Sequence, residues 1–162
     1  MVNDILVEIR GLLAAAMGSR CVGYYAGNIG IPANAQMPVC IVRRKSNELV
    51  ERRSTTADYY SCTLSVLVIT NIVKSLAVAG LTAGLVPSEN KLANIIEEKD
   101  TDGAPKLDTV AGVLTKESNL RGTNYQYITN VRTDYEPELN GKDTFAAAEV
   151  TFDVKFSITR KL

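Results

Sequence analysis

Apolar and polar residues alternate along the last part of the chain. Every second residue from Ala146 to Ile158 is apolar, and the residues between them are mostly polar. An alternation this long predicts a β-strand with one buried and one solvated face. Asn140-Gly141, shortly before it, favours a tight type I′ turn. The pattern therefore predicts a long hairpin over Asn124–Thr159.

A two-residue turn at this point determines the register of the two arms. It places Val131 opposite Val150 on the apolar face and Arg132 opposite Glu149 on the polar face. Arms of about sixteen residues span roughly 50 Å, which exceeds the usual strand length. We therefore expect the turn end, Glu136 to Asp143, to project and to contact a neighbouring subunit. The alternative is a twisted hairpin at the edge of a monomer.

Upstream of the hairpin, the pattern predicts further helices and strands. Apolar residues at three- and four-residue spacing predict an amphipathic helix over Asn3–Met17, in which Gly11 indicates close packing. Segment 71–84 is ambiguous. The other expected elements are two strands that form a hairpin, a second helix and a short strand, over Pro38–Arg44, Asp58–Thr70, Ser88–Lys99 and Leu107–Thr115. This order is typical of an α+β fold, an antiparallel sheet with helices packed on one face.

Size and composition suit one globular domain, residues 1–162. The chain is 46% apolar, and its 18 basic residues equal its 18 acidic residues, so no net charge steers it to nucleic acid or to a membrane surface. No apolar run is long enough for a membrane span, and the N-terminal residues do not resemble a signal peptide. The odd, widely spaced set Cys21, Cys40 and Cys62 favours free thiols over disulfides or metal ligands.

The residues offer little catalytic chemistry. The chain has no histidine, which excludes Ser-His and Cys-His mechanisms. The segment from Glu98 to Gly103 resembles the start of an EF-hand loop, but Thr109 occupies the position of the bidentate Glu. A solvated helix end and turn is favoured there over a weak divalent-ion site shared between subunits. We expect no enzyme activity, no cofactor and no metal site.

Three segments are candidates for contacts with partners. Tyrosines lie in the Gly/Pro-rich segment Arg20–Pro38, which we interpret as a docking segment or, alternatively, as a lid over a ligand. Arginines lie around the loop Lys45–Ala57, where a solvated loop or a docking surface for a protein is favoured over contact with phosphate. Glutamates lie near the hairpin turn. The candidate interface residues are Tyr24, Tyr25, Arg43, Arg44, Arg52, Arg53, Glu136 and Glu138.

The order of elements resembles that of the tail terminator, or tail-to-head joining, proteins of long-tailed bacteriophages with flexible tails. The similarity runs through the N-terminal helix, the Gly/Pro loop, a strand, a second helix, a turn and the C-terminal alternating strand. The segments that carry it are Pro38–Val42, Leu64–Ile69, Leu92–Glu98, Asp102-Gly103, Asp108–Leu114 and Ala146–Ile158.

The resemblance implies a structural protein that assembles into a hexameric ring. Such a ring caps the tail tube, stops its polymerisation and presents a surface to the head-completion protein. The resemblance also implies a location in the virion tail, reached from the host cytoplasm, with DNA passing through the ring without specific binding and with no membrane partner. The alternatives are a tail tube subunit, a head-tail connector component or, in another class, a small-ligand-binding domain that uses the Gly23–Pro38 loop.

Overall fold

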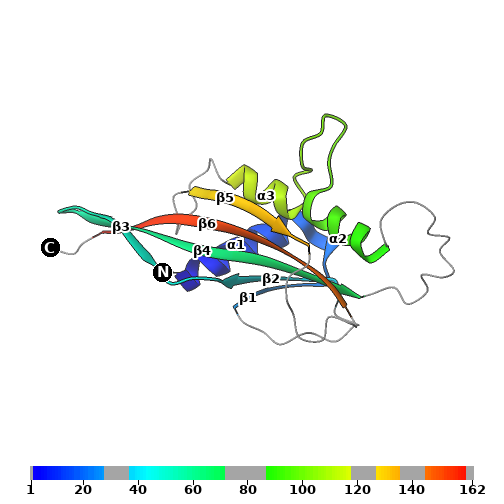
Figure 1. The fold of residues 1–162 in the computed structure, drawn as a ribbon, viewed down its shortest axis with the longest axis horizontal. Helices are drawn as coiled ribbons and strands as arrows, with labels where there is room; N and C mark the ends of the chain where they lie inside the picture. Colours follow the sequence, from blue (N-terminus) through cyan, green and yellow to red (C-terminus); the bar gives the residue numbers. More distant parts are fainter. Residues whose placement is uncertain (1, 28–36, 72–86, 118–126, 136–144, 160–162) are drawn as a thin grey trace.

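The computed structural model describes residues 2–27, 37–71, 87–117, 127–135 and 145–159 (Figure 1). Within these ranges, six strands form one sheet in the order β1-β2-β4-β6-β5, and β3 pairs with β4 beyond the end of β2. All neighbouring strands are antiparallel except β1 and β2, which are parallel. The strand bounds are β1 Gly23–Ala26, β2 Val39–Arg44, β3 Leu49–Arg53, β4 Ala57–Asn71, β5 Tyr127–Asp134 and β6 Phe145–Thr159.

The two central strands, β4 and β6, determine the shape of the sheet. Each is 15 residues long, and they pair over their whole length, from Ala57 opposite Thr159 to Asn71 opposite Phe145. The alternation that predicts these strands is confirmed, because Leu64 of β4 and Phe152 of β6 face each other in the core with no exposed surface. The strands predicted over Pro38–Arg44 and Asp58–Thr70 are β2 and β4.

The helices α1 Val2–Met17, α2 Pro87–Glu97 and α3 Val110–Glu117 pack on one face of this sheet (Figure 1). A short 3₁₀ turn, Gly18–Arg20, follows α1. The main core lies between the helices and the sheet and includes Ile5, Ile9, Leu13, Leu92, Ile96, Val110 and Leu114. A second buried cluster occupies the opposite face of the sheet and consists of Met37, Val39, Ile41, Leu67, Ile69 and Ala147. The predicted α+β fold is therefore confirmed, as are the helices predicted over Asn3–Met17 and Ser88–Lys99.

The strand predicted over Leu107–Thr115 is wrong, because α3 occupies this segment. Thr109 Oγ1 accepts a hydrogen bond from the Gly112 amide at 3.0 Å, which caps the start of the helix. Val110, Val113 and Leu114 then follow helical spacing and are all buried. The β-branched composition suggests a strand, but the cap and the three- and four-residue spacing decide the structure.

The pairing of β5 with β6 confirms the expected hairpin arms, but the predicted register is wrong. Tyr127 faces Lys155 and Arg132 faces Thr151, so Arg132 does not lie opposite Glu149. The register shifts between Thr129 and Arg132, which marks a β-bulge. The proposed turn at Asn140-Gly141 lies outside the described residues.

The bulge also changes which side chains of β5 are buried. Ile128 is buried, whereas Tyr127 and Val131, the predicted inner residues, are 44% and 38% exposed. Asn130 adopts a φ of 54°, a left-handed conformation that asparagine tolerates better than most residues. A two-residue turn determines the register only if neither strand contains an inserted residue. Because β5 contains one, the alternation of apolar residues assigns Val131 to the wrong face of the sheet.

Two short strands lie in segments predicted as loops. β1 forms within Arg20–Pro38 and pairs with β2, and β3 forms within Lys45–Ala57 and pairs with β4. The close packing expected at Gly11 is wrong, because a Cβ atom there would meet nothing within 4 Å. Apart from Asn71, the ambiguous segment 71–84 lies outside the described residues.

One end of the sheet extends beyond the helices as a three-stranded ribbon, at the left of Figure 1. We call this part the ribbon; it consists of Leu49–Arg53, Ala57–Ser61 and Lys155–Thr159, which pair as β3-β4-β6. The projection expected at Glu136–Asp143 lies outside the described residues. In the parts of the chain that the structure describes, no helix has the length and hydrophobicity needed to cross a membrane.

Candidate functional site

The ribbon carries apolar side chains that the protein leaves in solvent. All five residues of β3 are exposed, and Leu49 and Val50 are 67% and 45% exposed. Ile158, on the β6 strand of the ribbon, is 37% exposed. Val50 and Ile158 lie on one face of the ribbon, and Leu49 lies on the other. Exposed apolar side chains gathered at one end of a protein are typical of surfaces that bind another protein.

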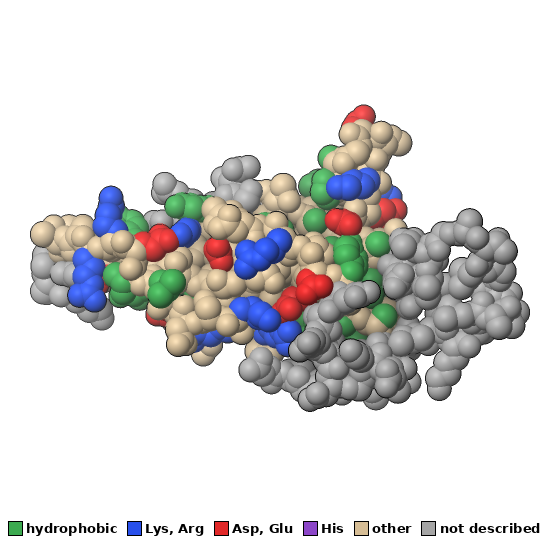
Figure 2. All heavy atoms as spheres, in the orientation of Figure 1, with side chains coloured by type: hydrophobic (Ala, Val, Ile, Leu, Met, Phe, Trp, Pro, Cys, Tyr) green, Lys and Arg blue, Asp and Glu red, His purple; other side chains and the backbone are tan. Residues whose placement is uncertain are grey.

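Basic side chains follow these apolar residues along β3. The guanidinium carbon of Arg52 lies 4.4 Å from the centre of the Tyr59 ring, so a cation–π contact holds this side chain against the ribbon. Lys155 forms an ion pair with Glu51 and ties β6 to β3 across the ribbon. Figure 2 shows Lys and Arg side chains beside hydrophobic ones at this end of the molecule. The ribbon therefore presents apolar and basic groups on an ordered backbone.

The sheet face opposite the helices carries an ion-pair cluster around Glu149. Arg43 Nη2 lies 2.8 Å and Lys45 Nζ 3.2 Å from Glu149 Oε1, and the Glu149 side chain is only 8% exposed. Burial acts to raise the pKa of Glu149, but hydrogen bonds from Arg43 and Ser65 outweigh burial and lower it. Arg43, a predicted interface residue, is thus engaged within its own chain.

A second polar network lies on the same face, nearer to the ribbon. Thr63 Oγ1 donates a hydrogen bond to Asp153 Oδ1 at 2.7 Å, and Asn130 Nδ2 donates to Asp153 Oδ2 at 2.8 Å. Burial would raise the pKa of Asp153, but these two donors and nearby cations lower it. The polar residues that alternate along β4 and β6 therefore bind one another across the strands.

The acidic segment after α2 is held by cations of the chain itself. Arg20 donates to Glu98 Oε2 at 2.7 Å and to Asp108 Oδ2 at 3.0 Å, and Lys106 donates to Glu98 Oε1 at 2.7 Å. Asp100 Oδ1 accepts hydrogen bonds from two amides of the following turn. Across the described ranges, no group of three or more His, Cys, Asp or Glu side chains is placed to hold a metal ion. The geometry is that of a helix end and turn.

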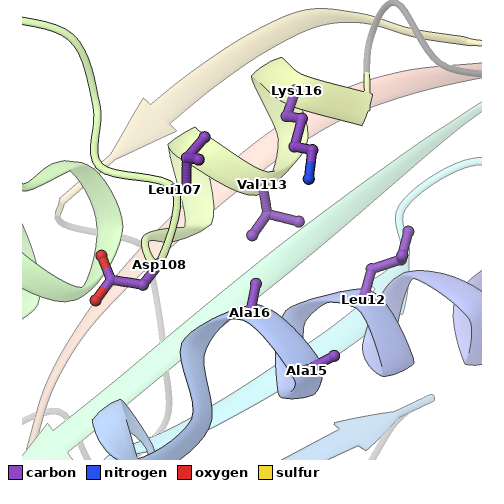
Figure 3. Close-up of a pocket in the computed structure, with 7 residues that line it drawn as sticks. All are labelled: Leu12, Ala15, Ala16, Leu107, Asp108, Val113 and Lys116. Carbon is purple, nitrogen blue, oxygen red and sulfur yellow. The ribbon is translucent and has the colours of Figure 1, made fainter.

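A groove lies between α1 and α3 (Figure 3) and has a volume of about 350 Å³. Its lining is mostly apolar and consists of Leu12, Ala15, Ala16, Leu107, Asp108, Val113 and Lys116. Leu107 on its rim is 65% exposed. Of its two charged residues, Asp108 is already paired with Arg20. The groove suits apolar side chains better than a polar small molecule, whose recognition needs several converging polar groups.

The predicted interface residues are distributed over several strands. Tyr24 of β1 donates a hydrogen bond to the Gly18 carbonyl at 2.8 Å, and the Tyr25 ring lies against Gly23, where a Cβ would come within 2.7 Å of it. Arg44 lies 3.7 Å from Glu48. Arg52 and Arg53 both lie on the ribbon, on opposite faces. Glu136 and Glu138 lie outside the described residues, as does most of the proposed lid, 28–36.

The sequence analysis does not predict two features of the candidate site, the exposed apolar pair of the ribbon and the groove between α1 and α3. Leu49-Val50 is an apolar pair between polar residues, a pattern that signals a short strand only weakly. The groove depends on α3, which the sequence pattern predicts as a strand. The signal present in the sequence is the pair of small residues Ala15 and Ala16, which lie off the buried stripe of α1.

The three cysteines are free, as expected, and all are buried. Burial raises the pKa of Cys21 to about 11 and also raises the pKa of Cys40 and of Cys62. Few of these thiols are therefore ionised near neutral pH, which makes them poor nucleophiles.

No protein-family model and no curated protein matches this sequence. Function is therefore inferred from the ribbon, the groove and the paired charges of the sheet.

Proposed function

We propose that this chain is a structural subunit that assembles into a closed ring and terminates the tail tube of a long-tailed phage. The observation that carries this proposal is the ribbon, which holds Leu49 and Val50 in solvent beyond the helices. Burying such side chains fully in an interface is worth about 1.5–3 kcal/mol each. A neighbouring subunit that covers the projecting end would explain why β4 and β6 extend beyond the helices.

The charge distribution agrees with this role. On the outer sheet face, Glu149 pairs with Arg43 and Lys45, Glu51 pairs with Lys155, and the chain as a whole is neutral. Strong binding to DNA would require several free cations aimed at phosphates. A ring that lets DNA pass without holding it has no such requirement. The resemblance in element order to tail terminators then favours a terminator over other ring proteins.

Tail tube subunits and head-tail connector components are the alternatives within the same class. A tube subunit polymerises into long open tubes, whereas a terminator stops at a ring. A ligand-binding function receives no comparable support, because the apolar groove lacks a set of converging polar groups.

Electron microscopy of purified tail tubes, with and without the chain, tests the terminator role. We expect a ring at one end of each tube and no further growth of capped tubes when tube subunits are added. A variant with Leu49→Ser and Val50→Ser should keep its circular dichroism spectrum but lose capping. Val22→Ser is the matched control, because Val22 is 63% exposed and lies outside the ribbon. Tubes that keep growing, or long tubes made by the chain alone, would contradict the proposal.

A further inference from the structure

The surface of α1 continues the α1–α3 groove toward the N-terminus of the helix. Asp4, Glu8, Leu12 and Ala16 follow one another at four-residue spacing, so each is the surface neighbour of the next along α1. Leu12 and Ala16 line the groove, and the two acidic residues lie beyond its end. This row of residues is therefore acidic toward the N-terminus of α1 and apolar toward its C-terminus.

The ribbon carries the complementary order of groups. Leu49 and Val50 are apolar and exposed, and Arg52 and Arg53 follow on the same strand. The pairs Val50–Tyr60 and Arg53–Asp58 put Val50 and Arg53 on one face of the ribbon, whereas Leu49 and Arg52 lie on the other face. A ribbon laid with this face on the groove, and with β3 antiparallel to α1, would place Val50 in the groove and Arg53 against the acidic residues.

We infer that the ribbon of one copy of this chain docks in the α1–α3 groove of the next copy. This inference rests on the proposed ring and names its subunit contact. Within one molecule the ribbon projects beyond the helices at one end of the sheet, so the two surfaces are placed for a neighbour (Figure 1). Because ribbon and groove are different surfaces, the contact is heterologous, and it repeats around a ring until the ring closes.

A charge exchange between the two surfaces tests this contact. The first variant carries Arg53→Glu on the ribbon, and the second combines Asp4→Arg and Glu8→Arg on α1. Each variant alone faces like charges at every contact, so we expect loss of the ring. An equimolar mixture can alternate the two variants with opposite charges at every contact, so the ring should return. The measurement is mass by light scattering, with circular dichroism as the check on folding.

The matched control reverses two exposed charges on and just after α2, with Lys91→Glu and Lys99→Glu, and should leave the ring intact. If the second variant fails to fold, Ala15→Glu replaces it, because it puts a carboxylate into the groove at an exposed helical position. Loss of the ring in that variant supports the contact, and an intact ring overturns it.

The outcomes separate this inference from the proposed function. Rings that survive both reversals, or that the mixture fails to restore, would overturn the ribbon-in-groove contact while the ring itself stands. A wild-type chain that stays monomeric at every concentration would overturn both.

Discussion

At the scale of single residues, burial determines the chemistry of the three thiols. Cys21, Cys40 and Cys62 have little exposed surface and raised pKa values. We predict that a polar thiol reagent labels all three slowly in the folded protein at neutral pH and rapidly in denaturant. A colorimetric thiol assay in the two conditions measures this. Fast labelling of Cys40 in the folded protein would contradict the placement of β2 in the core.

The lowered pKa of Glu149 makes the free energy of unfolding depend on pH. Its pKa is lowered on folding, so its contribution to the free energy of unfolding is complete above its ordinary pKa of 4.5 and disappears as the pH falls through the lowered value. Asp153 acts in the same direction. We predict that stability to urea falls from about pH 5 to pH 3. Glu149→Gln should be less stable at pH 7 and should show a shallower fall, whereas an unchanged pH profile would contradict the ion-pair cluster.

Arg43 provides a direct test of the same cluster. Removing its guanidinium in Arg43→Met leaves the nearly buried Glu149 carboxylate with Lys45 as its remaining cation. We predict a loss of about 2 kcal/mol in the free energy of unfolding at pH 7, from urea titration. The control is Arg53→Met, a change of the same type on the exposed ribbon, which should lie within about 0.5 kcal/mol of wild type. Equal effects of the two changes would argue against the pairing.

At the scale of elements, two helical glycines should respond to alanine with opposite sign. A Cβ on Gly112 would lie 1.9 Å from the Lys106 carbonyl oxygen, whereas a Cβ on Gly11 would meet nothing within 4 Å. Alanine favours a helix over glycine by about 1 kcal/mol. We predict that Gly11→Ala raises the melting temperature and that Gly112→Ala lowers it, because the loop before α3 must shift. A stabilising Gly112→Ala would contradict the tight entry into α3.

Elements with long, regular patterns could be predicted from the sequence. The alternation in β4 and β6 and the helical spacing in α1 extend over many residues, so burial of one face dominates their structure. α3 could not be assigned in this way, because Val110 and Val113 fit a strand as well as a helix and the cap at Thr109 depends on a local hydrogen bond. β1 and β3 are too short to carry a periodic signal.

The register of β5 and the candidate site show the same limit. The residue inserted near Asn130 changes the face of the sheet on which Val131 lies. A pattern of apolar and polar residues does not indicate where a single residue is inserted into a strand. For the site, charge alone is enough to predict Arg52 and Arg53 as exposed interface candidates. Leu49 and Val50 were missed because their meaning depends on the ribbon, which is a product of how β3 pairs with β4.

At the scale of the whole molecule, the helices cover only part of a sheet whose central strands are 15 residues long. The uncovered end is the ribbon, and the groove between α1 and α3 is a second apolar surface elsewhere on the same chain. The contact that we propose between these two surfaces is heterologous, and such contacts either close into a ring or grow without limit. The proposed function therefore depends on whether the chain assembles into a closed ring.

The most direct test is the mass of the assembled chain in solution, measured by native mass spectrometry and by light scattering over a wide range of concentrations. We predict one closed species with the mass of a hexamer of the 17.6 kDa chain, unchanged as the concentration rises. A monomer at all concentrations, or a mass that grows steadily with concentration, would contradict the account.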